Sequence, residues 1–253
     1  MKRSARTLAT ANSVKRISEV ELGKTTPLRM FVWRLRRGVR DILKGRDVLN
    51  VEPEESDGTR FKAREAYRNI NAFIEKSFPR LVVDTPIEVA RNMVHDRIKE
   101  LGYQIVEEDL SKPWGAYYRM ASKDAARFVG EFFPGLSMVE AKLGREDVEL
   151  SPKFLLVAPG NRLSWQYHER RAERWRFLTD GAYYRSHSDA MPEMLLHGKA
   201  GQVVQFDAGE RHRLCSEPYS KNYTLVAEIW QHTDDTHHSD ESDIVRLEDD
   251  YKR

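Results

Sequence analysis

The segment 163–173 reads LSWQYHERRAE and contains the spacing Gln166-x-His168, followed by Glu173. Residues two apart in a β-strand point to the same face of a sheet, so Gln166 and His168 are expected to face one common point. Glu173 is expected to follow after a short turn at residues 169–171. This spacing predicts a group of metal ligands on adjacent strands inside a barrel.

His212 lies in a second segment, 206–214, with the sequence FDAGERHRL, which has the pattern of a turn that enters another strand. Imidazole and carboxylate groups with one weak neutral oxygen suit zinc, iron or manganese better than magnesium. We predict one divalent metal ion, with Zn2+ as the first choice and Fe2+ or Mn2+ as alternatives. The predicted ligands are Gln166, His168, Glu173 and His212.

Short strand-like runs separated by turn signals continue along the second half of the chain. They cover 153–157, 174–178, 202–206 and 223–230, with turns such as Ala208-Gly209-Glu210 between them. Many short strands of this kind predict an all-β sandwich or barrel. The pattern before residue 104 differs, because apolar residues in 61–78 and 85–101 recur at helical spacing.

The chain therefore divides into three predicted parts: a basic extension with a linker at 1–60, a helical region at 61–111, and the barrel at 112–253. The extension carries Lys2, Arg3, Arg6, Lys15 and Arg16 before its first acid, Glu19. Two interpretations stand side by side, a solvated basic tail and an organelle transit peptide. The predicted location is accordingly cytoplasmic, with an organelle matrix as the alternative.

The composition excludes several classes of protein. The 253 residues carry a formal net charge of +2, which gives no overall nucleic-acid signature. The only cysteine is Cys215, so an internal disulfide is excluded and a reducing compartment fits. No apolar run approaches the length of a membrane span.

The motifs around the predicted ligands resemble those of type II mannose-6-phosphate isomerases. The residues that carry the first motif are Pro159-Gly160, Leu163-Ser164, Gln166, His168, Arg171-Ala172-Glu173 and Trp175. Gly209 with 212–214 resembles the second motif, while Lys112-Pro113-Trp114-Gly115 and 243–253 resemble the opening and the end of those domains. Standalone bacterial cupins labelled phosphoheptose or mannose-6-phosphate isomerase are similar over 127–134, 163–168 and 227–233.

The resemblance implies a mainly β fold, a cupin (double-stranded β-helix or jelly-roll) barrel, behind an α-helical N-terminal region. It also implies a metal-dependent aldose–ketose isomerase that acts on a small phosphosugar, with mannose 6-phosphate to fructose 6-phosphate as the first candidate. Gln166 favours this family, because many cupins have histidine at that position. A cupin dioxygenase is disfavoured, because such sites carry more histidine. The alternative is a non-catalytic sugar-binding or structural cupin whose basic extension docks an acidic partner, and a homodimer stays open.

Five further residues receive roles from the resemblance and from their positions. Ser164 and Arg171 are predicted to bind the substrate phosphate, with a barrel-lining hydroxyl as the alternative for Ser164. Arg246 is predicted to stabilise the negative charge of an enediolate. Glu228, on a late strand, is the candidate for proton transfer. Lys153 is the third catalytic candidate, although a lysine at a strand end is often exposed.

The chain departs from the isomerase pattern at the rim of the predicted pocket. His168, Glu169 and Arg170 stand where those enzymes commonly have three histidines, and Arg174 replaces a further histidine. The rim is therefore more basic, which bears on the choice of sugar. Three late histidines, His232, His237 and His238, form a cluster. We interpret it as a solvated loop in preference to a second metal site.

Overall fold

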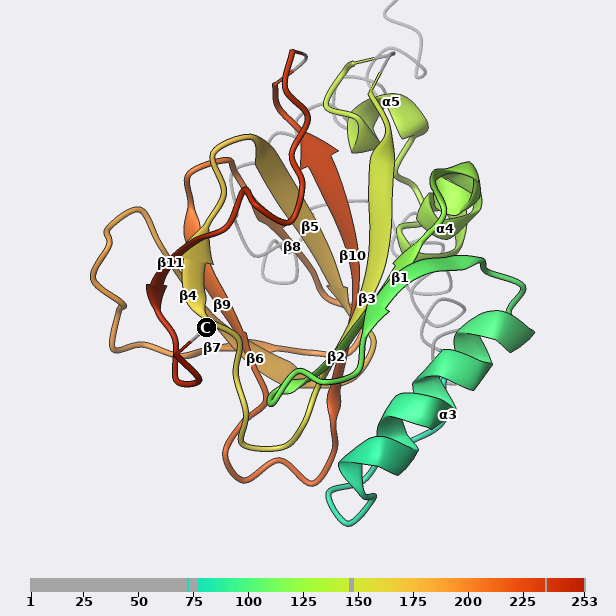
Figure 1. Ribbon diagram of the computed structural model, residues 1–253, viewed down its shortest axis with the longest axis vertical. Coiled ribbons are helices and arrows are strands. Elements are labelled where there is room, and N and C mark those ends of the chain that lie inside the picture. The colour runs from blue at the N-terminus through green and yellow to red at the C-terminus, as the bar shows by residue number, and fades with distance from the viewer. Residues whose placement is uncertain (1–71, 73–76, 146–147, 235, 253) are drawn as a thin grey trace, which may run out of the picture. The chain divides into compact units, whose positions relative to one another are not determined.

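The computed structural model describes residues 72, 77–145, 148–234 and 236–252 (Figure 1). The predicted extension at 1–60 and almost all of the helix predicted to begin at Phe61 lie outside these residues. No helix among the described residues has the length and apolar character needed to cross a membrane.

Within the described residues, eight consecutive strands form the barrel. They are β3 (Leu150–Val157), β4 (Trp165–Tyr167), β5 (Arg171–Phe177), β6 (Gly181–Ser186), β7 (Leu196–Gly198), β8 (Val203–Phe206), β9 (Arg211–Cys215) and β10 (Thr224–His232). One sheet contains the order β3-β10-β5-β8 and the other contains β4-β9-β6-β7. Consecutive strands thus alternate largely between two antiparallel sheets, which is a jelly roll. The prediction of a mainly β barrel of cupin type is confirmed.

Three more strands extend these sheets. β1 (Ile105–Asp109) and β2 (Gly115–Met120) join the edge of the first sheet, and β11 (Val245–Glu248) joins the second next to β4. The strands of the first sheet thus include β1, which precedes Lys112, the predicted start of the barrel. The first sheet already begins at Ile105, because β1 pairs antiparallel with β2.

The helices cover the outer side of the first sheet (Figure 1). They are α3 (Ile87–Glu100), the 3-10 turn η2 (Ser122–Asp124), α4 (Ala125–Phe132) and the short α5 (Met138–Ala141). α3 buries Ala90, Val94 and Ile98, which recur every fourth residue and so lie on one helix face. The predicted helix at 85–101 corresponds to α3.

Alternate residues of β3 divide between two hydrophobic clusters. Phe154 and Leu156 pack with the helices, whereas Leu155 and Val157 pack in the barrel interior. The two faces of a strand alternate with every residue, so Lys153 shares the interior face with Leu155. This alternation decides which polar side chains enter the barrel.

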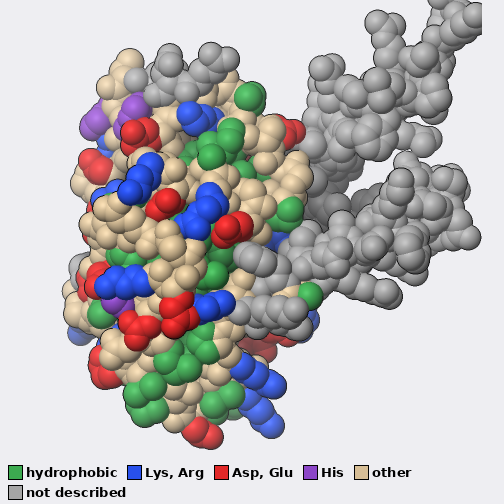
Figure 2. All heavy atoms as spheres, turned by 90° about the vertical axis from the view of Figure 1, so that its right-hand side faces the viewer, with side chains coloured by type: hydrophobic (Ala, Val, Ile, Leu, Met, Phe, Trp, Pro, Cys, Tyr) green, Lys and Arg blue, Asp and Glu red, His purple; other side chains and the backbone are tan. Residues whose placement is uncertain are grey.

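Charges of both signs are mixed on the described surface on the side of α3. Figure 2 shows Lys and Arg side chains interspersed with Asp and Glu over the described part of this face. Hydrophobic side chains gather between them, and exposed ones include Val89 and Met93 of α3.

The C-terminal residues are fixed to the barrel by a cluster of charges. The Asp250 carboxylate accepts hydrogen bonds from Arg213 Nη2 at 2.8 Å and from Arg162 Nε at 2.6 Å. The Arg213 side chain is fully buried, and Arg162 holds the pKa of Asp250 below its usual range. Because Asp250 follows β11 directly, this cluster helps to hold that strand in place.

We expect Asp250→Asn to lower the free energy of unfolding at neutral pH by about 1 kcal/mol, since Asp250 is part-exposed and solvent screens the pair. The folded pKa of Asp250 is depressed, so its stabilising effect is complete above the unfolded pKa of about 3.9 and disappears as pH falls through the folded value. Urea denaturation from pH 7 to pH 3 measures this difference. A gap between wild type and variant that stays constant down to pH 3 would contradict the assignment.

Candidate metal centre

Strand alternation places the predicted ligands inside the barrel. On β5, Trp175 and Phe177 belong to the interior cluster, so Glu173 and Arg171 face the interior as well. Gln166 of β4 lies directly opposite His212 of β9 in the pairing of these strands. The two motifs, far apart in sequence, therefore meet at one place.

His168, Glu173 and His212 form a compact and buried triad. Their candidate ligand atoms all lie within 4.8 Å of one another. His168 Nε2 is 3.0 Å from Glu173 Oε1, and His212 Nε2 is 3.2 Å from Glu173 Oε2. The structure thus brings together three of the four residues predicted as ligands, with both imidazoles directed at one carboxylate.

Backbone carbonyls fix which ring nitrogen of each histidine carries the proton. His168 Nδ1 lies 2.7 Å from the carbonyl oxygen of Asp243, and His212 Nδ1 lies 2.9 Å from that of Glu210. A carbonyl only accepts, so each Nδ1 donates and each neutral ring keeps its lone pair on Nε2. Burial lowers the pKa of His168, which favours this neutral form. Such outer hydrogen bonds are typical of histidines that bind metals.

The triad fits a divalent metal ion. Among the described residues, buried His212 Nε2 makes no hydrogen bond of acceptable geometry, although Glu173 Oε2 lies 3.2 Å away. Burial by itself would raise the pKa of Glu173, but positive charge on His168 and His212 holds it well below its usual range, and a metal ion bound between neutral imidazoles would supply positive charge at the same place. Two neutral imidazoles and one carboxylate are a donor set that suits zinc, iron or manganese.

Gln166 lies beside the triad with its amide nitrogen 3.4 Å from His168 Nε2. Its Oε1 accepts a hydrogen bond of 2.5 Å from Ser164 Oγ. A half-turn of the amide would direct the oxygen to the triad, and the Ser164 hydroxyl would then accept a hydrogen bond from the amide nitrogen. Ser164 therefore supports either orientation of the predicted fourth ligand.

Arg171 occupies a different environment from the predicted one. It belongs to β5 and not to a turn, and its buried Nε donates to Glu173 Oε1 at 3.0 Å. Nη1 donates to Ser239 Oγ and to the carbonyl oxygen of Asp240, and Nη2 lies 3.2 Å from His168 Nε2. Only the last contact would compete with a metal ion. Most donors of Arg171 are thus bound to protein groups that surround the triad.

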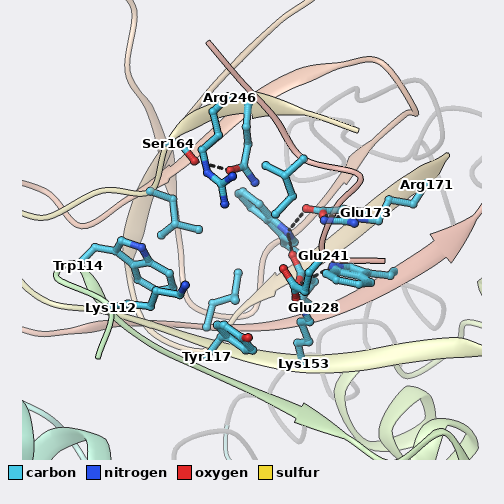
Figure 3. A pocket seen from close by; sticks show the side chains of 16 residues that line it. Lys112, Trp114, Tyr117, Lys153, Ser164, Arg171, Glu173, Glu228, Glu241 and Arg246 are labelled. Atoms are coloured by element: carbon cyan, nitrogen blue, oxygen red, sulfur yellow. Dashed lines mark hydrogen bonds and ion pairs between the residues drawn. The ribbon is translucent and has the colours of Figure 1, made fainter. Parts of the chain in front are cut away.

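Glu173 of the triad lines a pocket in the barrel interior, while His168 and His212 lie behind this lining (Figure 3). Thirteen residues give the lining its polar and aromatic character: Lys112, Trp114, Tyr117, Lys153, Ser164, Gln166, Arg171, Glu173, Trp175, Glu228, Trp230, Glu241 and Arg246. Every predicted catalytic and substrate-binding residue is therefore part of this one pocket.

Glu228 of β10 is buried and held by two indoles. Trp175 Nε1 donates to Oε1 at 2.8 Å, and Trp230 Nε1 donates to Oε2 at 3.0 Å. Burial raises the pKa of Glu228 well above its usual range, and the charge on Glu173 raises it further. The pKa values of Glu173 and Glu228 are thus shifted in opposite directions, one lowered and one raised, as in sites that separate acid and base roles.

Arg246 enters the pocket from β11, where it pairs with Gln166 across the strands. Figure 3 shows its guanidinium directed into the pocket near Ser164. Among the residues that the structure describes, no hydrogen bond or ion pair to this side chain is found, in contrast to Arg171. Arg246 is therefore available to a ligand.

The connection from β10 to β11 supplies residues that sequence analysis missed. Asp243 accepts hydrogen bonds from the backbone nitrogens of Glu169 and Arg170, both at 3.1 Å, while its own carbonyl holds His168. Asp243 and its neighbours carry no strand periodicity, so no sequence pattern indicated their place. The aromatic residues Trp175 and Trp230 were also missed, although strand alternation from Glu173 and Glu228 would have placed both inside.

The late histidines form no second group of metal donors with the other residues that the structure describes. The triad is the only group of three or more candidate metal donors found among the described residues. His232 is buried at the end of β10, accepts a hydrogen bond from the Ser239 backbone nitrogen, and stacks on His238 at 5.1 Å. The interpretation of a wholly solvated loop is wrong for His232, because the end of β10 lies inside the sheet.

No protein-family model and no curated protein sequence matches the chain. Similar solved structures include an oxalate decarboxylase of Bacillus subtilis, with 16% identity over 58% of this chain and a TM-score of 0.36. Vicilin from Corylus avellana has 13% identity and a TM-score of 0.34, and the match covers 51% of this chain and 32% of the vicilin chain. BH2720 of Bacillus halodurans has 13% identity and a TM-score of 0.30, and the match covers 36% of this chain and 67% of the BH2720 chain.

These three are cupin-fold proteins. The chain spans 30% of the length of the oxalate decarboxylase, whose Mn(II) centres are described in a related structure. Similarity at this level says nothing about activity. The strand order and the buried His-Glu-His triad define the class of protein: a cupin-type jelly roll with a candidate metal centre that opens on a charged pocket.

Proposed function

We propose that the protein is a metal-dependent aldose–ketose isomerase that acts on a small phosphosugar, with mannose 6-phosphate and fructose 6-phosphate as the first pair to test. One observation carries the proposal: Glu173 of the candidate metal centre lines the same pocket as Glu228, a buried carboxyl of raised pKa, and Arg246, whose guanidinium has no ion pair within the described residues. A proton carrier and a cationic group beside a metal are what the isomerisation of an open-chain sugar requires.

The remaining lining supports a sugar phosphate as the substrate class. Trp114 offers an aromatic face, against which the apolar face of a sugar packs. Lys112 and Lys153 add positive charge, and together with Arg246 they favour an anionic ligand.

His168, Glu173 and His212, with Gln166 after rotation of its amide, would hold the metal ion. A bound divalent ion would supply Lewis-acid polarisation of the sugar carbonyl. Arg171 orients Glu173 through its Nε hydrogen bond, so we assign it to positioning a metal ligand.

Glu228 is the residue that we assign to move a proton between C1 and C2 of the substrate. Its indole partners fix both oxygens, and its raised pKa favours the protonated carboxyl more than in an exposed glutamate. Lys153, close enough to Glu228 to lower that pKa, is the neighbouring charge that tunes it. Arg246 would stabilise the negative charge that appears on the sugar oxygens as the enediolate forms.

The test is a panel of aldose and ketose phosphates of six and seven carbons, assayed with purified protein whose metal content has been measured. Turnover of at least one pair that is lost on removal of the metal and restored on its return supports the proposal. A metal-loaded protein that converts no member of the panel, but binds sugars in calorimetry, would overturn it in favour of a non-catalytic sugar-binding cupin.

A further inference from the structure

Within the part of the chain that the structure describes, the buried Lys153 has one hydrogen-bonded carboxylate partner. Its Nζ donates to Glu241 Oε1 at 2.5 Å, and its side chain is only 4% exposed. Glu228 lies opposite Lys153 in the pairing of β10 with β3 and acts on it through its charge. The remaining close groups are aromatic faces, with Nζ 3.4 Å from the centre of the Trp230 ring and 4.8 Å from that of Tyr117. An ammonium has three N–H donors, and aromatic rings do not replace hydrogen-bond acceptors. The group can therefore accept further oxygen ligands from the pocket.

Glu241 is bound much less firmly than Lys153. Its side chain is 41% exposed, and it lies on the connection between β10 and β11 rather than in a strand. Glu241 makes no other hydrogen bond or ion pair in the part of the chain that the structure describes. A carboxylate that reaches from the rim to a buried cation inside a pocket occupies the position that a ligand anion would take.

We propose that Lys153 is the anchor for the anionic group of the ligand, a phosphate monoester, and that Glu241 occupies this subsite until the ligand displaces it. The identity of the phosphate-bearing ligand rests on the proposed function, but the subsite itself rests on Lys153 and Glu241. The proposal moves the phosphate contact away from Arg171, whose donors are bound to Glu173, Ser239 and Asp240.

The proposal predicts that one substitution in the pocket strengthens phosphate binding instead of weakening it. If Glu241 competes with the ligand, Glu241→Gln removes the competing charge and tightens the binding of inorganic phosphate by about two- to fivefold, as loss of a part-exposed ion pair implies. Lys153→Met should abolish phosphate binding. Isothermal titration calorimetry at pH 7.5 on the full chain measures both.

Asp180→Asn is the matched control, because it removes one negative charge from a surface pair in which Asp180 lies 3.1 Å from Lys199 Nζ. Its phosphate affinity should equal that of the wild type. A Glu241→Gln variant with equal or weaker affinity for phosphate overturns the proposal, as does a wild type that binds no phosphate. Circular dichroism identifies a Lys153→Met variant that fails to fold, and Glu241→Gln then decides alone.

The outcome is separable from that of the proposed function. Tighter phosphate binding by Glu241→Gln, in a protein that isomerises no sugar, would support the subsite and refute the isomerase. Isomerase activity with unchanged phosphate affinity would support the enzyme and refute the subsite.

Discussion

His168→Ala is expected to strip the metal ion from the protein and to lower its thermal stability. His168 offers an unprotonated Nε2 to the centre, and no other imidazole among the described residues reaches that position. A ligand that binds only the folded state stabilises it by about 2.7 kcal/mol at a hundred times its Kd. Metal analysis after dialysis and thermal denaturation with and without a chelator measure both effects. The chelator should lower the Tm of the wild type and leave that of the variant unchanged.

His197→Ala is the matched control, since His197 is exposed and pairs with Glu217 at the surface. It should retain full metal content and the wild-type response to the chelator. Full occupancy in a His168→Ala, His212→Ala double variant would show that the metal is held elsewhere. The identity of the bound ion decides between Zn2+, Fe2+ and Mn2+.

The triad could be predicted from the sequence because strand periodicity is local. A spacing of two residues predicts that Gln166 and His168 face the same point, and a glycine turn before His212 marks the start of β9. The same rule places Lys153 and Glu228 inside the barrel, where the structure has them. What the sequence could not supply was the distance between these groups, which depends on how the two sheets pack.

The surroundings of the triad depend on tertiary contacts that no local pattern encodes. Arg171 was predicted to face the substrate, yet it lies two residues before Glu173 on the same strand face and is bound to that carboxylate. Asp243 and Glu241 reach the site from the irregular connection between β10 and β11. Asp243 binds the backbone of Glu169, which lies 74 residues earlier in the sequence. The strands β1, β7 and β11 are short and pair at sheet edges, so their sequences carry little periodic signal.

Arg246→Ala is expected to lower kcat on the phosphosugar by about two to three orders of magnitude, as for the loss of one oxyanion donor. The charge that this guanidinium would stabilise appears only as the enediolate forms, so KM should change little. Steady-state kinetics on the pair found in the substrate panel measures the split. Metal content and Tm should remain those of the wild type, because Arg246 makes no hydrogen bond or ion pair to the described residues that form the centre.

Two further substitutions show whether this loss is specific. Arg80→Met removes an exposed arginine whose hydrogen bond goes to Asn222 at 3.4 Å, and it should leave kcat unchanged. Arg171→Ala should behave differently from Arg246→Ala, because it removes the donor to Glu173 and leaves a buried carboxylate with one partner fewer. We expect it to weaken metal binding and lower the Tm together with activity. If Arg246→Ala also loses the metal, Arg246 positions the metal ligands and its assignment to the transition state is wrong. If the variant changes KM and not kcat, Arg246 binds the substrate in the ground state and the assignment is wrong as well.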